Sequence, residues 1–225
     1  CDTSECGAIT GYGGGYDNVG FWYCSPEGES AIDGSASIGG NLRNFLYAEG
    51  KQGAVSEVAG TWLIENGRVE HSQALVGSVS GAFTFFSNGT TFRNVTFDSN
   101  TMTPFVIDLA PRNTLIENVR VLSGQSLASG VFRLGAVRGL VVRNLYINSL
   151  WGGLANIVPV TGAGAAADNG VADVLFDGVW ANGALNVGTN DAGGNAAILL
   201  HGQAGASLGA VRNVVVRNVH YDSNR

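Results

Sequence analysis

One short phrase recurs along this chain and constrains its fold more than any other feature. An asparagine stands at the centre of "LRNFLY", "IENGRV", "FRNVTF", "IENVRV", "VRNLYI" and "VRNVHY", and a seventh copy, "FDGVWA", has glycine there. These central residues, called anchors below, are Asn44, Asn66, Asn94, Asn118, Asn144, Gly178 and Asn218. Neighbouring anchors are 22 (Asn44 to Asn66) to 40 (Gly178 to Asn218) residues apart. Such spacing indicates stacked coils of fixed minimum length with loops of variable length between them.

Side chains around each anchor alternate as they do in strands. Positions two before, one after and three after the anchor are almost all apolar, as in Phe92, Val95 and Phe97, so we expect them to face inward. Asparagine and glycine most readily adopt a left-handed backbone conformation. Each anchor is therefore predicted to be a one-residue corner between two strands. Further strand-like runs lie between most anchors, at 82–86, 105–109, 131–134, 156–160 and 196–201.

Three short strands per coil with asparagine at one corner resemble the right-handed parallel β-helix of the pectin-lyase-like superfamily. The resemblance covers residues 40–225 and implies an all-β, single-stranded solenoid of about seven coils. In that superfamily a stacked asparagine ladder marks the tight turn at which these anchors would fall. Residues 1–39 are rich in glycine and aromatic residues, and we expect them to lack the coil period and to form a cap or plug.

Composition excludes several classes of function. The 225 residues are 45% hydrophobic and only 13% charged, which predicts a packed fold. A net charge of −6, with Lys51 as the single lysine, leaves no cationic surface for nucleic acid. No apolar run approaches the roughly 20 residues that a membrane-spanning helix needs.

The residues directly before the anchors alternate in sign. This charge row reads Arg43, Glu65, Arg93, Glu117, Arg143, Asp177 and Arg217. Because like charges on neighbouring strands destabilise a sheet, the alternation predicts a ladder of ion pairs that fixes the register. The row begins and ends on arginine, which weighs against simple head-to-tail stacking of chains. The last coil has no evident cap, so we expect a partner, flanking loops or further chain to cover it.

A second outward row, three residues before the anchors, is mostly aliphatic. The five members that form this aliphatic stripe are Leu63, Leu115, Val141, Leu175 and Val215. A row of this kind is rarely left to water. It either packs under residues 1–39 or contacts another protein, and we favour the protein contact.

A third outward row, two residues after the anchors, becomes aromatic in the last coils. It contains Tyr146, Trp180 and His220, with Trp151 in a neighbouring loop. Flat rings at regular spacing can stack on sugars, which would make this row a glycan-binding face. The alternative is that the long loops 148–153, 161–173 and 182–195 cover the rings.

Asp108, Arg133 and His201 are the candidate catalytic residues. Aligning the strand-like runs puts Asp108 beside Arg133 on adjacent coils, with His201 further up the same column. Polysaccharide-cleaving enzymes of this fold need converging acids, a base and often calcium. Asp108 and Arg133 look instead like another ion pair, and the scattered cysteines and histidines predict neither a metal site nor a cofactor.

The cysteines bear on localisation. Cys1 resembles the lipid-modified first residue of mature bacterial lipoproteins, although an arbitrary chain boundary would look the same. Cys6 and Cys24 would then remain to pair in an oxidising compartment. We therefore expect an extracellular or cell-surface protein whose contact with a membrane is a lipid on Cys1.

The sequence as a whole favours a non-catalytic surface scaffold that binds a protein partner or assembles with itself. A polysaccharide lyase or glycoside hydrolase is the enzymatic alternative, supported by analogy of fold alone. A carbohydrate-binding module that uses the aromatic row is the other alternative.

Overall fold

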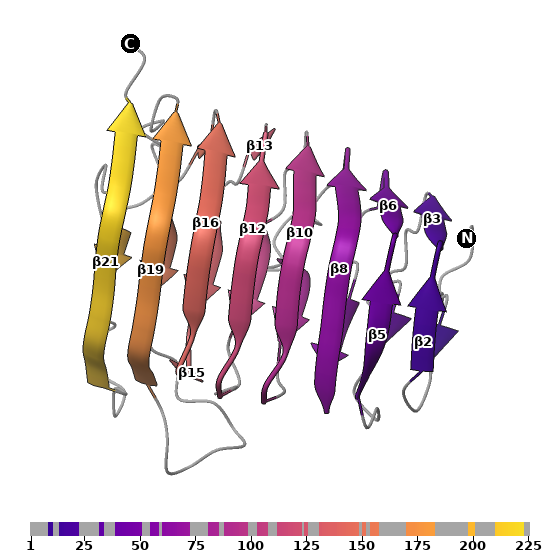
Figure 1. The fold of residues 1–225 in the computed structure, drawn as a ribbon, viewed down its shortest axis with the longest axis horizontal. Helices are drawn as coiled ribbons and strands as arrows, with labels where there is room; N and C mark the ends of the chain where they lie inside the picture. The colour runs from indigo at the N-terminus through magenta and orange to yellow at the C-terminus, as the bar shows by residue number, and fades with distance from the viewer. Residues whose placement is uncertain are drawn as a thin grey trace.

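A computed structural model of the chain consists of strands, turns and loops. It describes residues 9–10, 14–22, 32–33, 39–50, 55–58, 60–72, 81–85, 88–98, 103–107, 112–122, 124–125, 131–148, 150–151, 154–157, 170–182, 198–200 and 210–222. Within these ranges the protein is all-β, without a helix, and its strands pair in parallel (Figure 1). This arrangement confirms the predicted all-β class and is compatible with a β-solenoid.

The smaller of the two main sheets has eight strands in simple chain order. They are β1 (Ile9–Thr10), β4 (Ile32–Asp33), β7 (Val55–Val58), β9 (Gly81–Phe85), β11 (Thr103–Ile107), β14 (Phe132–Leu134), β18 (Ala155–Ile157) and β20 (Ile198–Leu200). The last five overlap the strand-like runs found between the anchors, and β9, β11 and β18 begin one or two residues earlier than those runs. Chain order within a parallel sheet means that each pass of the chain stacks on the one before it.

The larger sheet has eleven strands and carries the anchors. Its strands are β2 (Gly14–Asp17), β3 (Gly20–Trp22), β5 (Gly39–Arg43), β6 (Leu46–Ala48), β8 (Thr61–Glu70), β10 (Thr91–Asp98), β12 (Leu115–Val121), β15 (Val137–Arg138), β16 (Val141–Asn148), β19 (Gly170–Asn182) and β21 (Ala210–Asp222). A separate small sheet pairs β13 (Gly124–Gln125) with β17 (Leu150–Trp151). In Figure 1 the long strands run side by side from β2 and β3 at one edge to β21 at the other.

Every anchor is a left-handed corner, as the sequence predicts. The asparagine anchors have φ between 49° and 56°, and Gly178 has φ of 76°. The register is continuous, because residues at the same distance from the anchor pair from strand to strand, as Arg93 does with Glu65 and Glu117. A single corner position therefore aligns every row of side chains on the larger sheet.

The repeat begins before residue 39. Residues 1–39 were expected to lack the coil period, yet β2 pairs in parallel with β5, and β3 pairs in parallel with β6. Asn18, between these two strands, has φ of 56° and is an eighth anchor. Its surroundings, "YDNVGF", match the pattern but are embedded among glycines. Asp17 therefore extends the charge row by one member and keeps its alternation, since it pairs with Arg43.

A second row of left-handed residues lies five positions before the anchors. Its members are Gly89, Asn113, Gly139, Asp173 and Asn213, with φ between 51° and 74°. Asn213 Nδ2 donates a hydrogen bond of 2.8 Å to Asp173 Oδ1, which links two members across neighbouring strands. The constant spacing of five residues fixes the length of the strand segment between the two corners.

The inward columns form one hydrophobic core between the sheets. Phe83 lies at its centre, with ring centroids 4.7 Å from Phe92, 5.9 Å from Phe97 and 6.2 Å from Phe105. Gly67 is the exception in the column directly after the anchors. A Cβ there would lie 2.1 Å from the ring of Phe45, which already fills that space.

Candidate functional site

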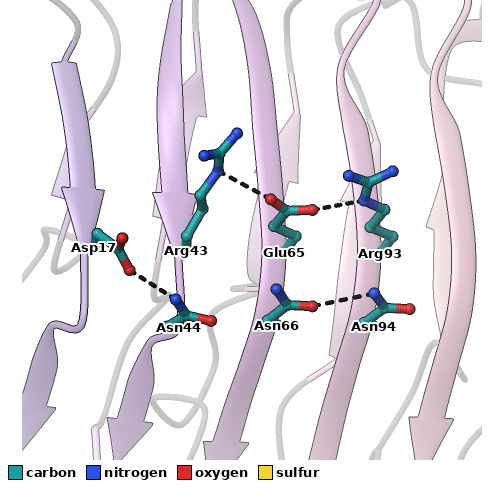
Figure 2. Close-up of polar contacts among 7 residues, drawn as sticks. All are labelled: Asp17, Arg43, Asn44, Glu65, Asn66, Arg93 and Asn94. Carbon is teal, nitrogen blue, oxygen red and sulfur yellow. Dashed lines mark hydrogen bonds and ion pairs between the residues drawn. The ribbon is translucent and has the colours of Figure 1, made fainter.

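The charge row and the asparagine ladder form a polar spine on the larger sheet (Figure 2). Glu65 accepts from Nε of Arg43 at 2.9 Å and from Nε of Arg93 at 2.6 Å, and its side chain is largely buried between them. A buried carboxylate needs such partners to offset its lost hydration. These pairs, with that of Arg217 and Asp177 at the other edge, confirm ion pairs between neighbouring strands at both ends of the charge row.

The anchors add a hydrogen-bond ladder with a fixed direction. Asn94 Nδ2 donates to Asn66 Oδ1 at 3.1 Å, and Asn118 and Asn144 repeat the contact with the preceding anchor at 3.2 and 3.1 Å. Asn44 Nδ2 donates to Asp17 Oδ1 at 2.8 Å. In each case the later residue in the chain is the donor, so the ladder is polar along the stack.

At the other edge, Asp177 holds the last strand. Arg217 donates to Asp177 Oδ2 and Asn218 Nδ2 donates to Asp177 Oδ1, each at 2.7 Å. These hydrogen bonds, that of Arg217 first, lower the pKa of the Asp177 carboxyl below its ordinary value of 3.8. Gly178 at the anchor of β19 has no side chain to accept from Asn218, and Asp177 accepts this bond just as Asp17 accepts the bond from Asn44.

The aliphatic stripe is a continuous row on the outward face of the larger sheet. Leu63 and Leu115 each pair with Thr91, which interrupts the stripe between them. Beyond Leu115 the pairing runs without interruption to Val141, Leu175 and Val215. Strands β8, β12, β16, β19 and β21 thus place the five predicted residues in one row, two positions along each strand from the charge row.

Members of the stripe are not equally accessible. Val215 on β21 is 48% exposed, whereas Leu63, Leu115, Val141 and Leu175 are half-buried between their neighbours. Packing side by side on a flat sheet accounts for this shielding. The stripe still presents a run of apolar side chains to the outside, flanked by alternating charges.

The aromatic row is also assembled as predicted from the register. Tyr146 pairs with Trp180, and Trp180 pairs with His220. Trp180 is 55% exposed, and its ring centroid is 5.1 Å from that of His220. Arg120 Cζ lies 5.7 Å from the centroid of the Tyr146 ring, so this part of the row makes its own cation–π contact.

The proposed catalytic column is only partly described. Arg133 lies in β14, where it pairs with Val106 on one side and Asn156 on the other. The alignment that set Asp108 beside Arg133 is therefore wrong by two residues. Loops of variable length separate this sheet from the anchors, so the register there could not be counted from the sequence. Asp108 and His201 lie outside the described residues.

Other predicted residues fall partly or wholly outside the described ranges. Trp151 belongs to β17, but its side chain is not described, and Cys1, Cys6 and Cys24 lie beyond the ranges given above. Among the described residues no group of three or more histidine, cysteine, aspartate or glutamate side chains could hold a metal ion. The same part of the chain contains no helix long and apolar enough to cross a membrane.

The chain matches no protein-family model, no curated protein and no solved structure. Function must therefore be argued from the surface rows themselves.

Proposed function

We propose that this protein is a non-catalytic scaffold of the right-handed parallel β-helix type, which binds a protein partner through the aliphatic stripe. The fold would resemble that of the pectin-lyase-like superfamily. The repeat around Asn18 would add one coil to the about seven that the sequence suggests. In this proposal the polar spine keeps the larger sheet rigid and the stripe supplies the contact surface.

The observation that carries the proposal is the continuity of the stripe. Four aliphatic residues from Leu115 to Val215 pair directly from strand to strand on an outward face. Contiguous apolar rows on soluble proteins commonly mark contact sites. The neighbouring charge row would add specificity, because alternating charges favour a partner with the complementary pattern.

Site-specific photocrosslinking in the source cells tests this function. A benzophenone amino acid at Val141, the centre of the uninterrupted row, should give one discrete adduct with another protein. The matched control at Thr96, a half-buried outward residue on the same sheet, should not. Adducts that join Val141 to residues 1–39 of the same chain would contradict the proposal, because the stripe would then be covered internally.

Binding of a glycan is the second candidate, favoured by the exposure of Trp180 beside His220. Exposed rings of this kind can stack on the apolar face of a sugar. Trp180→Ala should abolish retention on a panel of immobilised polysaccharides, with an unchanged circular dichroism spectrum. A wild-type chain that is not retained by any polysaccharide would eliminate this candidate.

A further inference from the structure

We propose that the two ends of the described sheets bind each other, so that β2 and β3 of one copy add, in a second copy, to the edge of β21 that no described strand covers. The partner is thus a second copy of the chain, stacked head to tail in parallel register. This inference does not depend on the aliphatic stripe, because it concerns the ends of the sheets rather than their outward face.

The edge at β21 is long and exposes three valines, Val211, Val215 and Val219. Among the described strands, this segment of 13 residues pairs with β19 alone. Val219 belongs to the inward column directly after the anchors, yet it is 48% exposed, while Val179 in the preceding strand is 1% exposed. Long, exposed edge strands of this kind are templates for pairing with another chain.

The opposite end of the molecule offers the matching strands. The first described pass of the chain contains β1, β2 and β3, and the last contains β20 and β21. β2 and β3 lie before and after the anchor Asn18, and β21 runs continuously through its own anchor, Asn218, so it covers both positions. β1 and β20 are the two outer strands of the smaller sheet, just as β2 with β3 and β21 lie at opposite edges of the larger one (Figure 1). A head-to-tail contact would therefore continue both sheets at once.

Charge at the two ends is complementary. Counted from Asn44, the charge row would have arginine at both ends, but with the anchor at Asn18 it begins with Asp17 and ends with Arg217. Stacking would set Asp17 of one copy beside Arg217 of the other and continue the alternation seen within the chain. The anchor at Asn18 thus replaces the arginine–arginine contact predicted for axial assembly by an aspartate–arginine contact.

The hydrogen-bond ladders have the polarity that such stacking needs. Within the chain, Asn18 N donates to Arg43 O and Leu46 N donates to Val19 O. The corresponding contacts between copies would join Asn218 N to Asp17 O, and Gly20 N to Val219 O. The side-chain ladder would continue as well. Within the chain, each of these anchor asparagines donates to the anchor of the preceding coil in the stack. In a head-to-tail contact Asn18 follows Asn218 in the stack, so Asn18 Nδ2 would donate to Asn218 Oδ1.

Sedimentation velocity of the full 225-residue chain over a wide concentration range provides the test. A head-to-tail contact does not close on itself, so wild-type protein should form a concentration-dependent ladder of species above the 23.2 kDa monomer. Asp17→Lys places a like charge against Arg217 and should weaken association about tenfold or more. Arg217→Glu should do the same from the other end.

Mixing the two variants gives the decisive control. An equimolar mixture of Asp17→Lys and Arg217→Glu brings opposite charges together at every alternating contact and should restore association. Wild-type protein that stays monomeric, Asp17→Lys protein that associates like wild type, or a mixture of folded variants that stays dissociated would each overturn the proposal. If Arg217→Glu protein does not fold, Asp17→Lys alone decides the outcome.

A stripe variant separates this inference from the proposed function. Leu115→Ser combined with Leu175→Ser leaves position 141 free for the crosslinker; it should lose the protein crosslink at the stripe but should associate head to tail like wild type. Association that fails in this folded variant would contradict the assignment of the contact to the ends of the sheets.

Discussion

The centre of the stack and its last described strand share the anchor pattern but have different environments. Val119 in β12 and Val219 in β21 each directly follow an anchor. β12 pairs with a strand on both sides, whereas β21 has one described neighbour, β19. Val119 is 1% exposed and Val219 is 48% exposed. The repeat therefore determines which way a side chain points, whereas burial depends on what stacks next to it.

The largest expected effect lies in the aromatic centre. Phe83→Ala removes a ring that contacts Phe45, Phe92, Phe97 and Phe105, and should lower the free energy of unfolding by about 3–5 kcal/mol. Urea denaturation followed by circular dichroism measures this loss. A change below about 1 kcal/mol would mean that the centre of the stack is no better packed than its end.

A matched pair sharpens the comparison. Val119→Ala deletes buried methyl groups and should cost about 2 kcal/mol, while Val219→Ala should cost less than about 1 kcal/mol in the monomer. The same denaturation measurement at low protein concentration compares the two. Equal losses would show that the end of the stack is covered in solution.

The smallest expected effect is the pH dependence of the free energy of unfolding that comes from the Asp177 carboxylate. Hydrogen bonds from Arg217 and Asn218 lower the pKa of Asp177 in the folded state, so its carboxylate stabilises the fold at pH values above 3.8. That contribution should disappear as the pH falls through the lowered folded-state pKa. Unfolding free energies of wild type and Asp177→Asn measured at about pH 6 and pH 3 isolate it from the other carboxylates.

The two proteins should differ more at the higher pH and converge at the lower one. Asp177→Asn keeps a side-chain oxygen for Asn218 but loses the charge that faces Arg217. A constant difference at both pH values would contradict the ion pair as the stabilising contact.

Much of the larger sheet could be predicted because its rows are counted directly from the anchors. The alternation around Asn94 correctly gave the inward columns, the ion pairs and the aliphatic stripe. The smaller sheet could not be counted in this way, and variable loops put Arg133 two residues from its expected partner. The anchor at Asn18 was missed because its neighbours include glycines, which weaken the apolar pattern that identified the others.

The anchor at Asn18 matters because it brings Asp17 into the charge row. Without Asp17 the row has arginine at both ends; with Asp17 its two ends are opposite in sign. The exposure of Trp180 and Val219 could not be read from the sequence either, because burial depends on neighbouring strands as well as on residue type.

Hydrogen exchange of the monomer tests most directly whether the last strand is an open edge of a continuous parallel stack. At a concentration low enough to keep the protein monomeric, amides of Leu115–Val121 in β12 should exchange slowly, because both neighbouring strands pair with it. In β21 (Ala210–Asp222), the alternate amides that point away from β19 should exchange much faster. Equal, slow exchange of both strands in the monomer would contradict this account.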